Sequence, residues 1–254
     1  MEKNRFRLLD IPFDLLSKEG ILSQIQEALQ KPAPKTIFSV NPEKIMRAYS
    51  DHKLKEALEH SDFLIPDGVG VVLASKLFYG KKTQRIAGIE LMEQLVALAA
   101  SKDKSVFFFG GEREVLEKSG HFFKKKFPNL KIAGSQNGYL AASQYPELIE
   151  QINALSVDFL FVGLGSPKQE LWLHEHRKDL KVRVAMSVGG SFDVFAGKVK
   201  RAPRWIQKIG CEWFFRLLQE PSRFRRQLVL PRFVFEVFRE KFLRRQQTTD
   251  MRRR

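Results

Sequence analysis

The sequence contains one cysteine and no long apolar run, and each of these absences excludes a class of protein. With Cys211 alone, no intrachain disulfide can form, which fits a reducing compartment. No stretch approaches the roughly 18 uninterrupted apolar residues that are typical of a membrane-spanning helix. The opening residues, MEKNRFRLLD, contain no apolar core of a signal peptide. We therefore expect a cytoplasmic protein without a transmembrane segment.

Acidic residues are scarce near the C-terminus, and positive charge collects there. The chain has 254 residues and a formal net charge of +15. Residues 198–254 contain 17 Lys and Arg against 5 Asp and Glu, a net of +12, whereas residues 1–197 contain 27 against 24, a net of +3. A basic region of this kind favours a polyanionic partner, which can be nucleic acid, an anionic membrane or a diphosphate.

Short apolar runs alternate with helical patterns over the first 197 residues. The strand-like runs lie at 6–11, 36–40, 62–65, 105–109, 130–133, 157–162 and 182–187, and helical patterns lie at 17–30, 53–59, 89–101, 115–127, 145–154 and 168–177. Such alternation is typical of a parallel sheet between two layers of helices. The sequence therefore predicts an α/β domain at 1–197 with an open, mostly parallel, Rossmann-like sheet covered by helices on both faces.

After Gly197 the strand-like runs stop, and helical patterns rich in aromatics and arginine begin. Two apolar faces follow, the first made by Trp205, Ile209, Trp213 and Leu217, and the second, after Pro231, by Val234, Val237, Phe238 and Phe242. We predict a basic, aromatic-rich helical appendage at 198–247 and a disordered tail at 248–254. The apolar faces either pack on the α/β domain or insert into a bilayer interface, with arginines at headgroup level. Cys211 lies in the appendage, and we interpret it as a packing residue.

The stretch DFLFVGLGSPKQE at 158–170 has the pattern of a strand, a loop and a helix. A buried strand breaks at Gly163 into GLGSP, and a helical pattern starts at Lys168. Glycine lets backbone N–H groups approach a ligand closely, and a helix N-terminus favours an anionic group. The loop glycines Gly163 and Gly165 and the neighbouring Ser166 are thus candidates for phosphate binding. An ordinary strand-to-helix turn has the same pattern.

Four further strand-like runs open into loops of small or polar residues. They are TIFSVNPE at 36–43, FLIPDGVG at 63–70, VFFFGGE at 106–112, which contains Gly110 and Gly111, and VRVAMSVGGSFD at 182–193. In an open parallel sheet, ligands bind in the crevice outside the carboxyl ends of the strands. Five such loops at one edge predict a binding site for a phosphate-bearing ligand.

Taken in order, SVNPEK, IPDGVGVV, QRIAG, NGYL, FVGLGSPKQE and VGGSFDVFAGKVKRAP resemble the motifs of the WecG/TagA/CpsF family of bacterial glycosyltransferases. The likeness runs from about Ser39 to Arg226. The best-known members extend undecaprenyl-diphosphate-GlcNAc with an N-acetylmannosamine-type sugar. The resemblance implies an inverting enzyme that transfers N-acetylmannosamine or its uronic acid from a UDP-sugar to undecaprenyl-diphosphate-linked GlcNAc, for cell-surface polysaccharide synthesis. It also implies a peripheral location on the inner face of the bacterial membrane.

Asp67 is the strongest candidate for a catalytic residue. It follows the apolar run 63–65 and lies between Pro66 and Gly68. From the sequence alone it is either the N-cap of a helix that begins near Val69 or a general base at a strand end. The resemblance implies the base, which takes a proton from the acceptor hydroxyl.

The resemblance also implies roles for polar residues in the other loops. Ser39 and Asn41 would bind substrate, and alternation along an extended segment puts their side chains on one side. The alternative is a turn in which Asn41 is fixed by Pro42. Arg85 would face the diphosphate, where a guanidinium suits the geometry better than an ammonium, although an isolated arginine is usually solvated. Gln169 would contact the sugar or the nucleotide.

Arginines of the appendage complete the predicted site. By resemblance, they reach over the active site toward the lipid diphosphate, and the candidates are Arg216, Arg223 and Arg226. Transfer from a nucleotide-sugar requires electrostatic stabilisation of the leaving diphosphate. On residue type alone, helical surface arginines are usually solvated.

A metal-binding device common among nucleotide-sugar transferases is missing from the sequence. No two aspartates lie two positions apart, so there is no Asp-x-Asp pair to hold a divalent ion. His174 and His176 flank Glu175, but on a helix their side chains would point about 200° apart. We therefore expect no metal and no cofactor.

Two other functions compete with glycosyl transfer. The basic C-terminal region would permit nucleic-acid binding, but no nucleic-acid-binding motif is present and the five loops would then have no role. A nucleotide-dependent oxidoreductase is disfavoured because VFFFGGEREV lacks the G-x-G-x-x-G spacing. We expect a UDP-sugar, a polyprenyl-diphosphate-linked acceptor and an anionic membrane as partners, and the sequence leaves homo-oligomerisation open.

Overall fold

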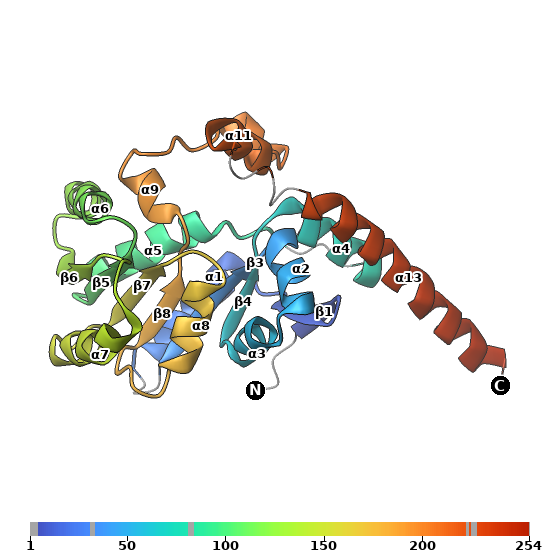
Figure 1. Ribbon diagram of the computed structural model, residues 1–254, viewed down its shortest axis with the longest axis horizontal. Coiled ribbons are helices and arrows are strands. Elements are labelled where there is room, and N and C mark those ends of the chain that lie inside the picture. Colours follow the sequence, from blue (N-terminus) through green and yellow to red (C-terminus); the bar gives the residue numbers. More distant parts are fainter. Residues whose placement is uncertain (1–4, 31–33, 81–83, 222–223, 225–227, 254) are drawn as a thin grey trace.

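The computed structural model describes residues 5–30, 34–80, 84–221, 224 and 228–253, the last nine of them through their backbone (Figure 1). Its centre is a sheet of six parallel strands in the order β4-β3-β8-β7-β5-β6. The strands are β3 (Lys35–Val40), β4 (Phe63–Pro66), β5 (Ser105–Gly110), β6 (Lys131–Gln136), β7 (Phe159–Gly163) and β8 (Val184–Ser187). The predicted α/β fold with a parallel sheet is confirmed.

Helices cover both faces of this sheet, and the strand sequences show why. In β5, Val106 and Phe108 belong to one buried apolar cluster, whereas Phe107 and Phe109 belong to the other. A strand with apolar side chains on both faces is buried between two layers. One layer contains α1 (Lys18–Ala28), α5 (Gly88–Ser101), α6 (Arg113–Lys126) and α9 (Ser191–Phe195), and the other contains α2 (Pro42–Ser50), α3 (His52–His60), α4 (Val69–Tyr79), α7 (Tyr145–Ala154) and α8 (Lys168–Glu175). A short 3₁₀ helix, η1 (Ala142–Gln144), precedes α7.

The order of the strands brings the site together. The chain winds outward from β3 to β4 on one side and from β5 to β6 on the other, and β7 and β8 return to fill the centre. The loops after β3, β8 and β7 therefore meet at the middle of the carboxyl edge. Ligands of open α/β sheets bind at such a change of direction.

The single strand predicted at 6–11 is wrong. These residues belong to an antiparallel hairpin outside the main sheet, formed by β1 (Arg5–Leu8) and β2 (Ile11–Asp14). Leu9 and Asp10 make its turn with φ of 49° and 61°. A two-residue turn with two positive φ values suits the twist of a hairpin, but Leu9 is an unusual residue for it, so the turn left no signal in the sequence.

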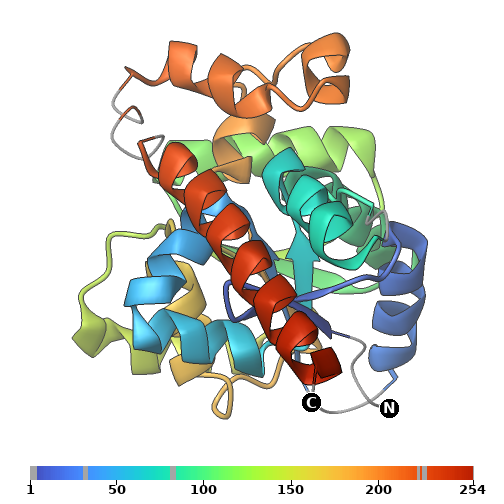
Figure 2. The same ribbon diagram turned by 90° about the vertical axis from the view of Figure 1, so that its right-hand side faces the viewer.

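The C-terminal appendage consists of α10 (Arg204–Lys208), α11 (Glu212–Gln219) and α13 (Val229–Arg253). Figure 2 shows α13 running diagonally across one side of the molecule, where it packs against α2. Phe233 and Val237 are buried in the apolar cluster beneath it. In the part of the chain that the structure describes, no helix has the length and apolarity needed to cross a bilayer.

Two expectations about the appendage differ from the structure. Of the apolar side predicted for the last helix, Val237 is buried, whereas Val234, Phe238 and Phe242 are exposed. Phe233, which was not assigned to that side, takes the second buried position. Helix α13 also continues to Arg253 and so runs through most of the predicted tail at 248–254. This polar segment contains no glycine or proline that would end a helix.

Candidate functional site

A cavity of about 790 Å³ lies at the carboxyl edge of the sheet, between the strand-end loops and the appendage. The loops after β3, β4, β7 and β8 contribute to its wall, and α4, α11 and α13 close it from the other side. Eight of the predicted site residues line it: Ser39, Asn41, Asp67, Arg85, Gly165, Ser166, Gln169 and Arg216. The fold therefore brings together most of the predicted site residues that the structure describes.

Asp67 follows β4 directly, and its backbone N–H donates to the carbonyl of Val40 at 2.8 Å. The side chain does not cap α4, because the N-cap of that helix is Gly68, at a φ of 119°, and no side chain bonds its first turn. Asp67 Oδ2 instead accepts a bond of 3.3 Å from the N–H of Gly88, the first residue of α5. Of the two sequence-based alternatives, the N-cap of the following helix is therefore wrong.

The surroundings of Asp67 favour a role in proton transfer. Burial raises the pKa of the Asp67 carboxyl above that of an ordinary aspartate, while the charge of Arg85, the Gly88 N–H and the charge of Lys44 oppose this effect. Glu212 of the appendage raises the pKa further. A carboxylate whose pKa is moved toward neutrality is a better general base than a solvated one.

Arg85 lies just before α5 and reaches across to the appendage. Its Nη2 pairs with a carboxylate oxygen of Glu212 at the start of α11, and its Nη1 donates to the Gln207 carbonyl at 3.3 Å. Arg201 joins the same group, at 2.5 Å from Glu90 and 3.6 Å from Glu212. Arg85 is therefore half-buried in a charged cluster at the cavity and is not a solvated surface residue.

Ser39 and Asn41 both line the cavity, as the alternation of the extended segment predicts. Asn41 is also the N-cap of α2, and its Oδ1 accepts a bond of 2.8 Å from the N–H of Lys44. Pro42 occupies the first turn of the helix. The turn and the cavity roles of Asn41 thus coexist, because the cap uses its oxygen and leaves the amide nitrogen for other partners.

A buried ion pair between Lys44 and Glu170 is a part of the site that the sequence motifs did not reveal. Lys44 Nζ lies 2.7 Å from Glu170 Oε1, and both residues are buried. Gln169 is buried beside them, with Nε2 donating to Glu170 Oε1 at 2.7 Å and Oε1 accepting from the Gly189 N–H at 3.0 Å. The motifs PEK and KQE contain both charges, but their spacing along the chain gives no sign that they pair.

Three predicted glycines do not line the cavity. A Cβ on Gly110 would come within 2.9 Å of Gly163 Cα, and a Cβ on Gly163 would lie 2.7 Å from the ring of Phe192. Gly110 and Gly163 therefore permit close packing of β5 on β7 and of β7 on α9. Gly111 follows at a φ of 69°, which favours glycine without placing it at the cavity. These contacts explain Gly110 and Gly163 as packing positions, and the predicted role of the three glycines in ligand binding stays a prediction.

Arg216 reaches the cavity from α11 and lies against the loop after β8. A Cβ on Gly190 of that loop would collide with Nη2 of Arg216, so the missing side chain makes room for the guanidinium. Gly190 thus admits an appendage arginine to the edge of the sheet. Arg223 and Arg226, the other two predicted arginines, lie outside the described residues.

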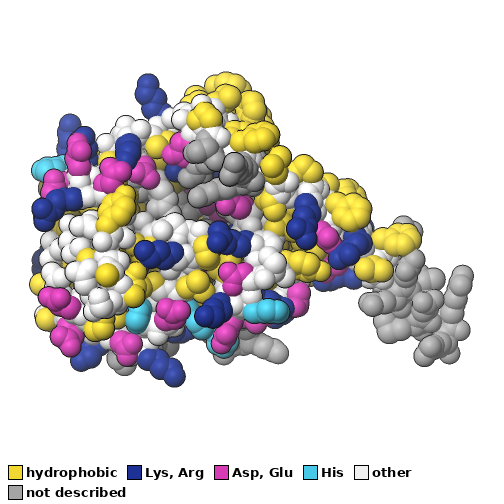
Figure 3. All heavy atoms as spheres, in the orientation of Figure 1, with side chains coloured by type: hydrophobic (Ala, Val, Ile, Leu, Met, Phe, Trp, Pro, Cys, Tyr) yellow, Lys and Arg dark blue, Asp and Glu magenta, His cyan; other side chains and the backbone are white. Residues whose placement is uncertain are grey.

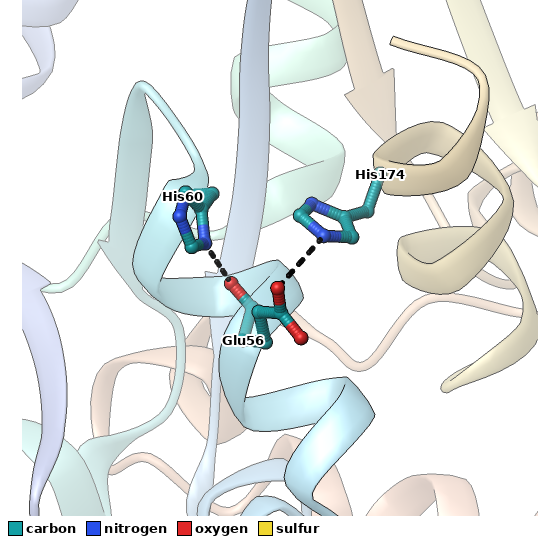
Figure 4. Close-up of side chains that lie close together, drawn as sticks. All are labelled: Glu56, His60 and His174. Atoms are coloured by element: carbon teal, nitrogen blue, oxygen red, sulfur yellow. Dashed lines mark hydrogen bonds and ion pairs between the residues drawn. The ribbon is translucent and has the colours of Figure 1, made fainter.

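A group of metal-type ligands occurs elsewhere, where α3 meets α8 (Figure 4). It consists of Glu56, His60 and His174. His176, which the sequence analysis considered together with His174, does not belong to it. His60 Nδ1 lies 2.9 Å from the backbone oxygen of Glu56, and His174 Nε2 lies 3.9 Å from Glu56 Oε1. None of the three lines the cavity, so this group is separate from the site.

A cavity lined by several cationic side chains at the carboxyl edge of a parallel sheet is typical of α/β enzymes that bind phosphate-bearing ligands. The model of the WecG/TagA/CpsF family of glycosyl transferases matches residues 6–247. Two relatives, from Bacillus subtilis and Bacillus spizizenii, are named N-acetylglucosaminyldiphosphoundecaprenol N-acetyl-beta-D-mannosaminyltransferase. They are 37% and 39% identical to this chain, each over 80% of it and over 79% and 78% of their own lengths. The chain therefore belongs to the WecG/TagA/CpsF family and is a glycosyltransferase.

Proposed function

We propose that this enzyme transfers an N-acetylmannosamine-type sugar from a UDP-sugar to undecaprenyl-diphosphate-linked GlcNAc. The observation that supports it most is the pairing of Asp67, with its raised pKa, and a set of cations in one cavity. Lys44, Arg85 and Arg216 line the same cavity as Asp67. Both proposed substrates carry diphosphates, and the relatives are named for this acceptor and this sugar.

The reaction assigned to this geometry is a single displacement. Asp67 takes the proton of the attacking acceptor hydroxyl, whose oxygen forms a bond to the anomeric carbon of the donor sugar. The bond from that carbon to the UDP oxygen breaks, and UDP leaves with the electron pair. One base and one displacement invert the anomeric configuration. Arginine is suited to the developing diphosphate charge because its guanidinium can donate two parallel hydrogen bonds.

We further propose that the appendage rests on the inner face of the bacterial membrane. Figure 3 shows hydrophobic side chains gathered over α11 and along α13, with lysine and arginine beside them. Trp205, Phe214, Phe235 and Phe238 are all exposed. Aromatic side chains among basic residues suit the interface of an anionic bilayer, and a lipid-linked acceptor would be presented there.

A transfer assay tests the proposed function. The purified chain is incubated with a panel of UDP-sugars and a short-chain lipid-diphosphate-GlcNAc, and the product is identified by mass and anomeric configuration. We expect UDP-N-acetylmannosamine or its uronic acid to react and the product to be inverted. Turnover with neither donor, or a product of retained configuration, would contradict the proposal.

Flotation with vesicles tests the membrane part separately. We expect the full chain to float with anionic vesicles at low salt and to be partly released at high salt, because each basic residue near the surface contributes about 1 kcal/mol that salt screens. A chain that ends at Gly197 should not float. A full chain that ignores anionic vesicles and binds DNA with a steep salt dependence would favour the nucleic-acid alternative.

A further inference from the structure

The buried pair of Lys44 and Glu170 joins two separate loops of the active-site edge. Lys44 lies in the first turn of α2, after β3, and Glu170 lies in the first turn of α8, after β7. The two strands are not neighbours, because β8 runs between them. The ion pair therefore joins the elements on either side of β8, and Lys44 and the neighbouring Gln169 line the cavity.

Gln169 connects this pair to the loop after β8. Glu170 Oε1 accepts from both Lys44 Nζ and Gln169 Nε2, each at 2.7 Å, and Gln169 Oε1 accepts from the Gly189 N–H at 3.0 Å. Burial alone would raise the pKa of Glu170, but the charge of Lys44 and the hydrogen bonds from Lys44 and Gln169 hold it below that of an ordinary glutamate. An ionised carboxylate only accepts, and the Gly189 N–H only donates. Together they permit one orientation of the Gln169 amide.

The position of these charges is poorly explained by stability. A cation in the first turn of α2 opposes the helix dipole, and a buried ion pair can often be replaced by apolar residues without loss of stability. Local preferences that are violated next to an active site often reflect function. The network ends at Gly189, and the adjoining Gly190 is the residue against which Arg216 lies.

We propose that Glu170 is a positioning residue for the transfer reaction, fixing Gln169 and Lys44 and, through Gln169, the Gly189–Gly190 loop at the cavity wall. This inference rests on the proposed function for its kinetic part. It also gives Gln169 a different role from the predicted contact with the sugar or the nucleotide. The buried amide of Gln169 uses its nitrogen for Glu170 and its oxygen for Gly189, so Gln169 acts mainly by orienting the loop.

The kinetic test is a double-mutant cycle of Glu170→Gln and Gln169→Met. Displacement of a positioned group can lower turnover by about 10²-fold, so we expect Glu170→Gln to lower kcat by that order while KM for the donor changes little. The double variant should be slowed by far less than the product of the two single effects, because residues that act as one unit are non-additive. Glu175→Gln, an exposed change on the same helix, is the matched control. Independent, multiplying effects or wild-type turnover in Glu170→Gln would overturn the inference.

Hydrogen exchange gives a readout that needs no turnover. Loss of the charged acceptor should loosen Gln169, and the Gly189 amide should exchange roughly tenfold faster in Glu170→Gln than in wild type or Glu175→Gln. Unchanged exchange there would refute the network whether or not the wild type is active. Inactivity of the wild type with every donor would instead count against the proposed function alone.

A second variant covers the case in which Glu170→Gln does not fold. Lys44→Met with Glu170→Met removes both charges and should fold, since no unpaired buried charge remains. We expect its turnover to stay lower by about 10²-fold. Wild-type turnover in this folded variant would overturn the inference.

Discussion

The α/β domain and the appendage differ in how far their large apolar side chains are exposed to solvent. Twelve of the seventeen large hydrophobic residues that the structure describes as exposed lie after residue 197. Trp205 is 65% exposed and Phe235 64%, whereas Phe107, Phe108 and Phe109 of β5 are fully buried. An apolar surface of this density on a small helical segment marks a site of contact with another phase or partner. The domain buries most of its large apolar side chains, whereas most of those in the appendage are exposed, which supports the proposed contact with a membrane.

The salt bridge inside the domain is also more deeply buried than the salt bridge that joins the domain to the appendage. Lys44 and Glu170 form a pair inside the domain in which both side chains are buried. The pair of Arg85 and Glu212, which joins the domain to α11, keeps about a quarter of each side chain exposed, 26% and 22%. A buried pair fixes geometry, whereas a partly exposed pair is weaker and is screened by salt. The contact between Lys44 and Glu170 therefore orders the site, whereas the contact between Arg85 and Glu212 holds α11 more lightly; α13 is held instead by the burial of Phe233 and Val237.

The largest expected effect is on the chemistry of the domain. Asp67→Asn should lower turnover by roughly 10²–10⁴-fold, because it removes the proposed general base. The asparagine oxygen can still accept from the Gly88 N–H, so the fold should be preserved. Steady-state kinetics and circular dichroism measure the two properties. Turnover within a few-fold of wild type would show that Asp67 is not the base.

Two phenylalanines of α13 separate docking from membrane contact. Phe233→Ala should lower the free energy of unfolding by about 3–5 kcal/mol, because it leaves a cavity in the apolar cluster under the helix. Phe235→Ala, the same change two residues away, removes an exposed ring and should leave stability almost unaltered. Denaturant unfolding measures the first effect. In vesicle flotation the ranking should reverse, with Phe235→Ala the weaker binder at a temperature where both are folded.

The raised pKa of Asp67 predicts a gain of stability when its charge is removed. Folding raises the pKa of this group, so its contribution to stability is fully present below the unfolded pKa and is lost as pH rises through the folded pKa. At neutral pH the ionised carboxylate therefore destabilises the native state. Asp67→Asn should unfold at a higher temperature than wild type at neutral pH, and the difference should shrink as pH falls. Equal unfolding temperatures across the pH range would contradict the raised pKa.

A smaller effect is expected at the junction of the two regions. Glu212→Gln weakens the pair with Arg85, and the free energy of unfolding should fall by no more than about 1 kcal/mol because the pair is partly exposed. The effect should diminish at high salt. Unfolding titrations at two ionic strengths measure it. A loss of several kcal/mol would mean that α11 is docked as firmly as a core element.

Removal of divalent metal should have no effect on turnover. Six cationic residues line the cavity, namely Lys44, Arg47, Arg85, Lys200, Arg201 and Arg216, against the three acidic residues Glu43, Asp67 and Glu212. Arginine and lysine can neutralise the leaving diphosphate without an ion. The assay is repeated after metal stripping with excess EDTA. Complete loss of turnover that magnesium or manganese restores would refute this prediction.

The sequence by itself determined the class of fold and most of the site. The run at 159–162 is apolar on both faces and ends in glycine, and such runs alternate with helical patterns, which suffices for a parallel sheet between helices. The carboxyl ends of parallel strands share one edge, so the sequence alone places Ser39, Asn41, Asp67, Gly165 and Ser166 together, and in the structure all five line one cavity. The motif resemblance added Arg85, Gln169 and Arg216.

Only the tertiary structure decided which residues meet across the chain. Lys44 and Glu170 are 126 residues apart, and Arg85 and Glu212 are 127 apart. The first pair depends on the position of β8 between β3 and β7, and the second depends on the docking of α11 over the carboxyl edge of the sheet. Periodicity records which face of an element is buried, but not which element covers it. For that reason the sequence could not show that Gly110 and Gly163 pack closely against neighbouring elements. The buried side of α13, with Phe233 and Val237, likewise depends on where α13 packs, which is against α2.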